Sequence, residues 1–371
     1  MNFDFSDELN QLRDQARRFL AEHATPKHVR RVLDGEKPYD GALWLKMAEM
    51  GWLGAAIPEE YGGAGIGHEG LCVLAEELGR VVAAVPFASS VCLATEALLI
   101  AGSAAQKRSY LPGFAAGMHI GTLAWAEGAG NPRSGAFTAR FAGGKLSGTK
   151  WPVLDGGSAD LAVVTAQNEA GQPVLVLADL RAGGVARTVL ETVDPSRPQA
   201  RLVLDRVAGE LLGAPGEGLI LLQKLLDRAA VLMAFEQLGG ATACLEMATN
   251  YARERYAFGR PIGSFQAIKH KLADVYIANE LARSNAYYGA WALQTGAAEL
   301  ALAAASARIS GIEAFHLASK ENIQTHGGMG FTWEADCHLF YRRAKLLALT
   351  IGSATHWKHR LVDALEARNA A

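Results

Sequence analysis

A block of short β-type runs, enclosed by two longer helical stretches, most constrains the fold of this chain. The runs Leu161–Thr165, Val174–Leu177 and Arg201–Leu204 are separated by Gly, Pro, Asp and Asn, as is typical of strands joined by turns. Apolar residues on both sides recur at helical spacing instead. Because helices and strands occupy separate blocks, the sequence predicts an α+β fold with segregated layers. The predicted parts are an N-terminal helical domain over 1–120, a middle antiparallel β domain over 121–213 and a C-terminal helical domain over 214–371.

The N-terminal part is predicted to hold several helices and one irregular stretch. Ser6 is a suitable N-cap, and the acidic residues Asp7 and Glu8 that follow it favour the first turn of a helix. A second helix is expected over 43–50. The stretch IPEEYGGAG at 57–65 contains proline and several glycines, so no regular structure is expected there before a helix resumes at Leu71.

The C-terminal part carries the clearest helical periodicity. One helix is expected to bury a single face, and to begin after the loop 259–264, which offers a good cap. The residues of that face are Ile268, Leu272, Val275 and Tyr276. An alanine-rich run without proline predicts a second long helix over 297–320.

Charge and composition exclude several classes of function. Lysine and arginine total 36 against 38 acidic residues, so the formal net charge is −2 and no basic excess points to nucleic acid. The ten histidines are scattered, and His356 and His359 lack acidic or cysteine partners nearby in the sequence, so no metal site is expected. The four cysteines form no CxxC pair and are expected to be reduced and buried: Cys72, Cys92, Cys244 and Cys337.

Targeting features are also absent from the residues given. The start, MNFDFSDELN, has acids where a secretory signal would carry basic and then apolar residues. No apolar run approaches the roughly 18–20 residues that a membrane helix needs. We therefore expect a cytoplasmic protein that does not span a membrane.

Two segments carry residues suited to binding a cofactor. The first, RYAFGRPIGSFQ at 255–266, combines cations, aromatic rings, an amide and glycines, which can hold a phosphate and stack on a planar ring. The second, QTHGGMG at 324–330, has three glycines in four residues, which allow a ligand to approach the backbone closely. Each segment taken alone is also compatible with an ordinary helix turn, and His326 by itself is expected to be structural.

Taken together, the motifs resemble those of the acyl-CoA dehydrogenase family of flavoproteins. The resemblance covers essentially the whole chain, with four motifs in the same order: Phe5–Glu8, 57–65, 255–266 and 324–330. It implies an N-terminal helical domain, a middle β domain and a C-terminal four-helix bundle, in agreement with the order of helices and strands above.

The resemblance further implies FAD, bound at an interface between subunits of a dimer or a dimer of dimers. Arg255 is then expected at the FAD pyrophosphate, Phe258 beside the cofactor and Gln266 at its adenosine side. The neighbouring subunit is expected to line the cofactor tail with Gln324, Gly327 and Gly328.

The catalytic base of the family is missing from its usual positions. The family introduces a 2,3 double bond into an acyl-CoA thioester, and a glutamate removes the α-proton. One of the two positions that hold this glutamate matches Ile351, and the other matches Ala229. Asp227 lies two residues from Ala229 and is a candidate base after a small shift in register, although a solvated helix charge or a partner of Arg228 is an equally simple interpretation. Glu236, two turns on, is expected to be structural.

The middle domain departs from the family as well. Ala126 occupies the position of the threonine hydroxyl that bonds the isoalloxazine. The residues that cover the flavin ring match Pro152–Leu154, with Trp151 one residue away as a substitute. The contacts for the FAD tail are therefore kept, while those for the redox ring and the base are altered.

Several functions remain open on the sequence alone. The chain is either an active homodimer or homotetramer whose base is not recognised, with Asp227 as a weak candidate, or the base-lacking subunit of a hetero-oligomer. In the second case a related partner supplies the base and the ring contacts. Some family members pair unlike subunits for bulky substrates such as steroid side-chain CoA thioesters, and residues 265–274 resemble those members. A purely non-catalytic assembly role, or another flavin-dependent reaction such as oxygenation or loss of a β-leaving group, is a further alternative. The family implies acyl-CoA as substrate and an electron-transferring flavoprotein as electron acceptor.

Overall fold

The computed structural model describes residues 5–130 and 137–370, and the chain divides into two compact units. Unit 1 comprises residues 1–27, 72–83 and 230–371, and unit 2 comprises 28–71 and 84–229. This division follows contacts rather than blocks of secondary structure. The borders predicted at 120/121 and 213/214 stay a prediction.

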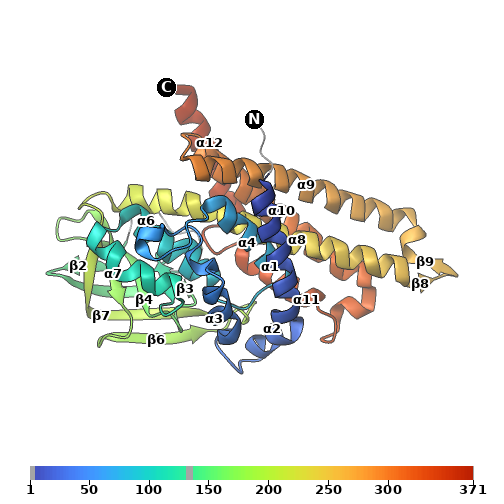
Figure 1. The fold of residues 1–371 in the computed structure, drawn as a ribbon, viewed down its shortest axis with the longest axis horizontal. Helices are drawn as coiled ribbons and strands as arrows, with labels where there is room; N and C mark the ends of the chain where they lie inside the picture. The colour runs from blue at the N-terminus through green and yellow to red at the C-terminus, as the bar shows by residue number, and fades with distance from the viewer. Residues whose placement is uncertain (1–4, 131–136, 371) are drawn as a thin grey trace. The chain divides into compact units, whose positions relative to one another are not determined.

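Unit 1 is built from helices (Figure 1). Its short elements are the paired strands β8 (Tyr256–Ala257) and β9 (Arg260–Pro261) and the 3-10 turns η4 (Ile262–Ser264) and η5 (Gly327–Phe331). Its α-helices are α1 (Asp7–His23), the end of α4 (His68–Arg80), most of α8 (Gly218–Glu254), α9 (Gln266–Thr295), α10 (Leu300–His326), α11 (Cys337–Leu347) and α12 (Ala354–Ala370). Three long helices, α8, α9 and α10, are thus followed by the shorter α11 and α12.

Two glycines allow α4 and α8 to approach each other closely. A Cβ atom on Gly239 would lie 1.9 Å from the carbonyl oxygen of Glu76, and one on Gly79 would lie 2.0 Å from that of Glu236. Real Cβ atoms do not come so close, so both positions require glycine at this distance between the helices. The crossing brings Glu76 and Glu77 of α4 beside α8, where they are buried.

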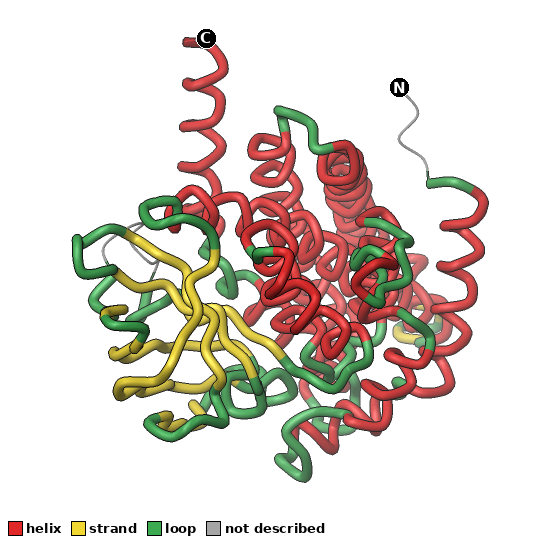
Figure 2. The backbone as a smooth tube through the Cα atoms, turned by 60° about the vertical axis from the view of Figure 1, so that its left-hand side comes forward, coloured by secondary structure: helices red, strands yellow, loops and turns green. Residues whose placement is uncertain are grey.

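Unit 2 combines short helices with one sheet. Figure 2 shows the strands of this sheet in yellow. The helical elements are most of α2 (Pro26–Leu33), α3 (Gly41–Glu49), η1 (Trp52–Gly54), η2 (Glu59–Tyr61), the start of α4, α5 (Phe87–Ser89), the π-helical turn η3 (Ser90–Thr95), α6 (Glu96–Ala101), α7 (Ala104–Ala115) and the start of α8. The strands are β1 (Gly121–Ala124), β2 (Arg140–Ala142), β3 (Lys145–Leu154), β4 (Leu161–Gln167), β5 (Pro173–Asp179), β6 (Val185–Leu190) and β7 (Gln199–Leu212).

The sheet is mixed rather than purely antiparallel, which corrects the predicted antiparallel domain. Its strand order is β1-β4-β2-β3-β7-β5, with β6 on β7 and a further pairing of β5 with β4 that closes the ring. Most pairs are antiparallel, but β1 and β4 run parallel, as do β2 and β4 at Arg140 and Gln167. A parallel pair joins strands that are distant in sequence through a long connection, and local turn signals cannot reveal it. β4 is buried at nearly every residue, as expected of a strand covered on both faces.

Local predictions hold where local chemistry decides the structure. Ser6 caps α1 by accepting the Leu9 N–H, and the four cysteines are buried and form no disulfide. Residues 57–65 contain only the 3-10 turn η2.

Two predictions about α9 are wrong. Its N-cap is Phe265 without a side-chain hydrogen bond, because the Ser264 hydroxyl donates to the Pro261 carbonyl instead. Val275 is buried, but 57% of Tyr276 is exposed, so the expected buried face is incomplete within this chain.

Candidate functional site

In unit 2, the Ala126 segment lies directly beside Trp151. The Trp151 N–H donates to the Ala126 carbonyl over 2.9 Å, and Glu127 and Trp151 form a parallel β-bridge. Ala126, where the hydroxyl is missing, and Trp151, the suggested substitute for the residues that cover the flavin ring, are therefore neighbours in space. The sequence stretch that begins at Ala126 ends at Asn131, which lies outside the described residues.

A buried ion pair holds this strip in place. Lys150 is fully buried, and its Nζ atom lies 2.7 Å from Oε1 of Glu127 and 2.9 Å from the Thr165 hydroxyl. Burial alone would raise the pKa of Glu127, but hydrogen bonds from Lys150, Thr138 and Ala139 lower it to about 2. Burial lowers the pKa of Lys150 to about 8, against the opposing effect of Glu127. The pair joins β3 to the segment after β1.

The start of α8 carries a second buried charged group. Glu96 is fully buried, and its two carboxylate oxygens contact Arg228 Nε at 2.5 Å and His68 Nε2 at 2.9 Å. Burial would raise the pKa of Glu96, but His68 and Arg228 lower it below its usual value. Asp227, which precedes Arg228 in α8, is 8% exposed, and Ala229, which follows it, is fully buried. Asp227 is therefore not a solvated helix charge. The guanidinium of Arg228 donates its hydrogen bond to Glu96.

In unit 1, Ile351 lies in a turn whose backbone is held on several sides. Its side chain is fully buried, and its carbonyl accepts a hydrogen bond of 3.2 Å from the Trp357 indole. Thr350 donates to the Leu346 carbonyl over 2.9 Å, and the buried guanidinium of Arg308 donates to the Leu347 carbonyl. Burial lowers the pKa of Arg308 to about 9. The turn thus presents a fixed aliphatic side chain where the resemblance expects a base.

Glu236 also has a structural position. It is 4% exposed, and its Oε1 atom lies 3.5 Å from the buried Arg343 of α11. Arg343 donates a second hydrogen bond to the Ala83 carbonyl over 3.1 Å. These contacts agree with the structural role predicted for Glu236.

The segment 255–266 forms a small hairpin. β8 pairs with β9, and the two residues between them, Phe258 and Gly259, both have positive φ, at 54° and 81°. Such a turn favours glycine, so Phe258 is held in a conformation that non-glycine residues rarely adopt. Its ring is 96% exposed, while Arg260 stacks over the Phe265 ring at 4.0 Å.

The segment 324–330 continues a helix into an open turn. α10 extends to His326, beyond the predicted end at residue 320, so Gln324 lies on the helix. His326 bonds the Asn322 carbonyl over 2.8 Å and stacks on Tyr251 at 4.1 Å, a structural arrangement. A Cβ atom on Gly327 or Gly328 would meet nothing within 4 Å, so packing within the chain does not explain these glycines.

The residues predicted for the cofactor tail fit a group that approaches from outside this chain. All six are exposed: Arg255, Phe258, Gln266, Gln324, Gly327 and Gly328. A guanidinium and two amides can bond phosphate and hydroxyl oxygens, and two open glycines let such a group reach the backbone. Their roles stay a prediction, since no contact within the chain tests them.

Two family models match most of the chain. The acyl-CoA dehydrogenase N-terminal domain matches residues 6–118, and the acyl-CoA dehydrogenase C-terminal domain matches residues 216–357. The chain belongs to the acyl-CoA dehydrogenase family. This membership supports an oxidoreductase that acts on CH–CH bonds and implies FAD as its cofactor. The predicted family and its α+β fold are thereby confirmed.

Individual acyl-CoA dehydrogenases are similar to this chain over nearly its full length. Acyl-CoA dehydrogenase IpdE2 of Mycobacterium tuberculosis is 33% identical over 91% of this chain and 91% of its own. A solved variant of the Tcur3481–Tcur3483 steroid ACAD is 34% identical with a TM-score of 0.89, covering 98% of this chain and 99% of that one. A chain of the ChsE4–ChsE5 complex from Mycobacterium tuberculosis is 29% identical with a TM-score of 0.89 and covers 99% of both chains.

Within residues 5–130 and 137–370, no helix is both long and apolar enough to cross a membrane. Over the same residues, no three His, Cys, Asp or Glu side chains are grouped so as to hold a metal ion.

Sequence reasoning missed three charged residues of this family member: Glu96, Lys150 and Arg308. Each is fully buried and bonded to residues far along the chain. A local signal existed for two of them, because Glu96 and Arg308 interrupt apolar, alanine-containing runs. A lone charge in such a run indicates a buried partner but does not identify it.

Proposed function

We propose that this chain is the base-lacking subunit of a heteromeric acyl-CoA dehydrogenase. The observation that carries the proposal is Ile351, a fully buried aliphatic side chain at one family base position, together with the fully buried Ala229 at the other. Neither side chain can accept a proton. A related partner subunit would supply the base and the contacts to the flavin ring.

The exposed residues of this chain would hold the tail of FAD. Arg255 offers a guanidinium to a pyrophosphate, and Gln266 and Gln324 offer amides to hydroxyl groups. Gly327 and Gly328 leave their backbone accessible. FAD, when bound, accepts the hydride that leaves the β-carbon of the acyl-CoA.

The α-proton would be removed by the partner, because Ile351 places a buried side chain without a proton acceptor at this position. Bonds from Trp357, Thr350 and Arg308 hold the turn at Ile351, so it has little freedom to present another group. A rigid site without a base supports substrate binding but not proton abstraction.

The substrate class that we propose is a bulky acyl-CoA of steroid origin, oxidised in the cytoplasm. The support comes from the relatives, since one similar solved structure is described as a steroid ACAD and another as the ChsE4–ChsE5 complex. An electron-transferring flavoprotein is the electron acceptor that we propose, in agreement with a similar solved structure described under that name.

The alternative within the family is a homo-oligomer that uses Asp227 as base. Asp227 is 8% exposed and lies in α8, two residues before Ala229. Because its carboxyl is buried, Asp227 is a better candidate base than an acid on the surface would be. Its side chain is, however, one methylene shorter than that of glutamate.

Flavin content and turnover test the proposal. The chain is purified alone and together with a co-expressed related subunit, and its visible absorption and acyl-CoA oxidation are measured. We expect little flavin and no turnover for the chain alone, and a yellow, active complex for the pair. In the pair, Arg255→Gln should lower flavin content, whereas Asp227→Asn should leave the rate unchanged.

Three results would overturn it. Turnover by the chain alone that disappears in Asp227→Asn would establish the homo-oligomer. Oxygen uptake with reduced flavin, without α,β-dehydrogenation, would indicate a different flavin reaction. Failure of the chain to bind FAD or acyl-CoA with any related subunit would indicate an assembly role.

A further inference from the structure

A hollow of about 320 Å³ lies within unit 1, and none of the residues assigned to the cofactor lines it. It is bordered by residues of α1, α4, α8 and α11. Its apolar wall includes Leu20, Val81, Met247 and Phe340. Its polar wall includes two arginines, Arg17 and Arg80. A small concave site with apolar walls and a few convergent charges is the usual form of a small-molecule site.

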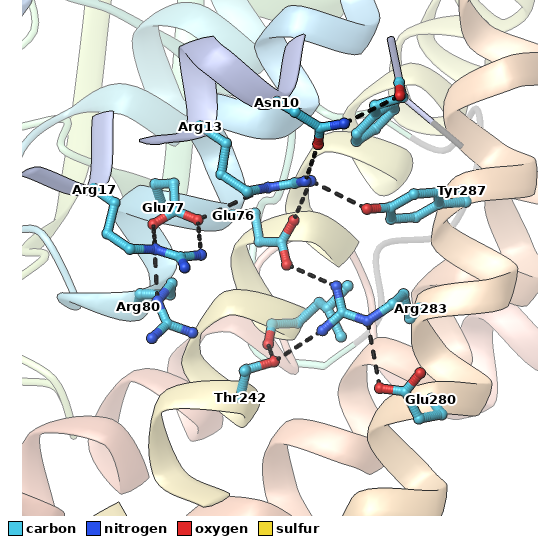
Figure 3. Close-up of polar contacts among 12 residues, drawn as sticks. Asn10, Arg13, Arg17, Glu76, Glu77, Arg80, Thr242, Glu280, Arg283 and Tyr287 are labelled. Carbon is cyan, nitrogen blue, oxygen red and sulfur yellow. Dashed lines mark hydrogen bonds and ion pairs between the residues drawn. The ribbon is translucent and has the colours of Figure 1, made fainter. Parts of the chain in front are cut away.

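The charges beside the hollow alternate in sign. Arg17 binds Glu77 with two hydrogen bonds of 3.0 and 2.7 Å, and Arg80 Nε lies 3.7 Å from Oε2 of the same carboxylate (Figure 3). Arg13 Nε lies 4.0 Å from its Oε1 atom. Arg80 Nη2 then donates to Glu246 over 2.5 Å. Glu77 is buried and fixed among three cations.

Glu246 differs from Glu77 in its freedom. Its side chain is 53% exposed, whereas that of Arg80 is only 17% exposed. An exposed ion pair of this kind contributes at most about 1 kcal/mol, so the Glu246 carboxylate can leave at little cost. When it leaves, the connected ion pairs beside the apolar wall carry a net charge of +1, from four arginines (Arg13, Arg17, Arg80, Arg283) against three glutamates (Glu76, Glu77, Glu280).

We propose that this hollow binds a small monocarboxylate with an apolar body, whose carboxylate replaces that of Glu246 at Arg80. A guanidinium matches the planar geometry of a carboxylate. A single negative charge restores neutrality, whereas a phosphate dianion would exceed it. The apolar part of the ligand lies against Leu20, Met247 and Phe340. Glu246 acts as an internal competitor that lowers the affinity of the site.

Octanoate serves as the probe, and calorimetric titration of the purified full-length chain measures its binding. Glu246→Gln should bind octanoate about fivefold more tightly than the native chain, the factor that an exposed ion pair of about 1 kcal/mol represents. Arg80→Gln should weaken binding by at least about tenfold, since the charged hydrogen bonds to the ligand are lost. 1-Octanol should bind more weakly than octanoate to Glu246→Gln and equally to Arg80→Gln.

Two further variants make the test independent of folding defects. Glu280→Gln removes a comparable, partly exposed partner of Arg283 on α9 that does not border the hollow, and binding should not change. Ala243→Leu places a larger side chain in the hollow and should abolish binding without removing a charge.

Three outcomes would each overturn the proposal. They are equal or weaker binding by Glu246→Gln, unchanged binding by Arg80→Gln, and no titratable binding of octanoate by any folded variant. None of these outcomes depends on flavin or on a second subunit, so the test stands apart from that of the proposed function.

Discussion

Lys150 and Glu127 form an ion pair of 2.7 Å in which the lysine side chain is completely removed from solvent. The pair fixes the position of Ala126 relative to Trp151, because Glu127 follows Ala126 and Lys150 precedes Trp151. Buried ion pairs of this kind add little net stability, but the loss of one partner leaves an uncompensated charge. Loss of Lys150 alone is therefore expected to cost more stability than loss of both partners.

Lys150→Met should lower the free energy of unfolding by about 3–5 kcal/mol, because it leaves the Glu127 carboxylate without its cation. Urea unfolding at neutral pH measures the change. The double variant Glu127→Gln with Lys150→Met is the control and should recover part of the loss, since no lone charge remains. A double variant no more stable than Lys150→Met would contradict this account.

The same pair predicts the response to acid. The pKa of Glu127 is about 2 in the folded chain, against 4.5 for the free side chain, so the unfolded chain binds more protons between these values. The stability that Glu127 contributes is therefore complete above about pH 4.5 and is lost as the pH falls towards 2.

Urea unfolding at several pH values tests the acid response. The difference in stability between the native chain and Glu127→Gln should shrink steadily below about pH 4.5. A difference that stays constant down to the lowest pH at which the chain folds would disprove the assignment.

Gly239→Ala should destabilise unit 1 by several kcal/mol, about the upper end of single substitutions. Its Cβ atom would lie 1.9 Å from the Glu76 carbonyl, and that oxygen belongs to a helix backbone that cannot move alone. Gly289→Ala is the matched control in a helix, because its nearest contact is a Val231 methyl at 3.2 Å. Thermal unfolding should separate the two variants clearly, and equal melting temperatures would refute the close crossing of α4 and α8.

Much of the fold was predictable from the sequence because it depends on local chemistry. Ser6 caps α1 by its own side chain, and the β-type runs correspond to β4, β5 and β7. The parallel pair β1–β4 was not predictable, since its register depends on strands some 40 residues apart, as in Gly121 and Leu161.

The candidate site divides in the same way. The sequence alone shows that Ile351 and Ala229 cannot act as a base, because this follows from residue type. The sequence does not identify the partner of Glu96, since Arg228 lies 132 residues further along the chain. Whether Asp227 is exposed or buried likewise depends on the packing of α8, which periodicity does not resolve.

Ile351→Glu should make stability depend on pH. A carboxyl group in this fully buried position would have a raised pKa, so the folded chain would hold a proton that the unfolded chain releases above about pH 4.3. Stability should therefore fall as the pH rises, by about 1.4 kcal/mol for each unit by which the pKa is raised.

Ile351→Gln is the control for this variant, because it has nearly the same shape and no titratable group. Urea unfolding at about pH 5 and about pH 8 should show a widening gap between the two variants. A constant gap would indicate that the new carboxylate reaches solvent, and that the turn is less rigid than its bonds to Trp357 and Arg308 suggest.

The Glu96–Arg228 pair predicts strong energetic coupling. Arg228→Met should cost about 3–5 kcal/mol, because Glu96 is fully buried and would lose its guanidinium partner while keeping the contact with His68. Glu96→Gln should also destabilise, since Arg228 then loses its carboxylate. In the double variant the two costs should not add, and urea unfolding of all four proteins gives a coupling free energy of at least about 1 kcal/mol. Additive costs would mean that Glu96 and Arg228 act independently, and that the contact of 2.5 Å between them does not hold α6 to the start of α8.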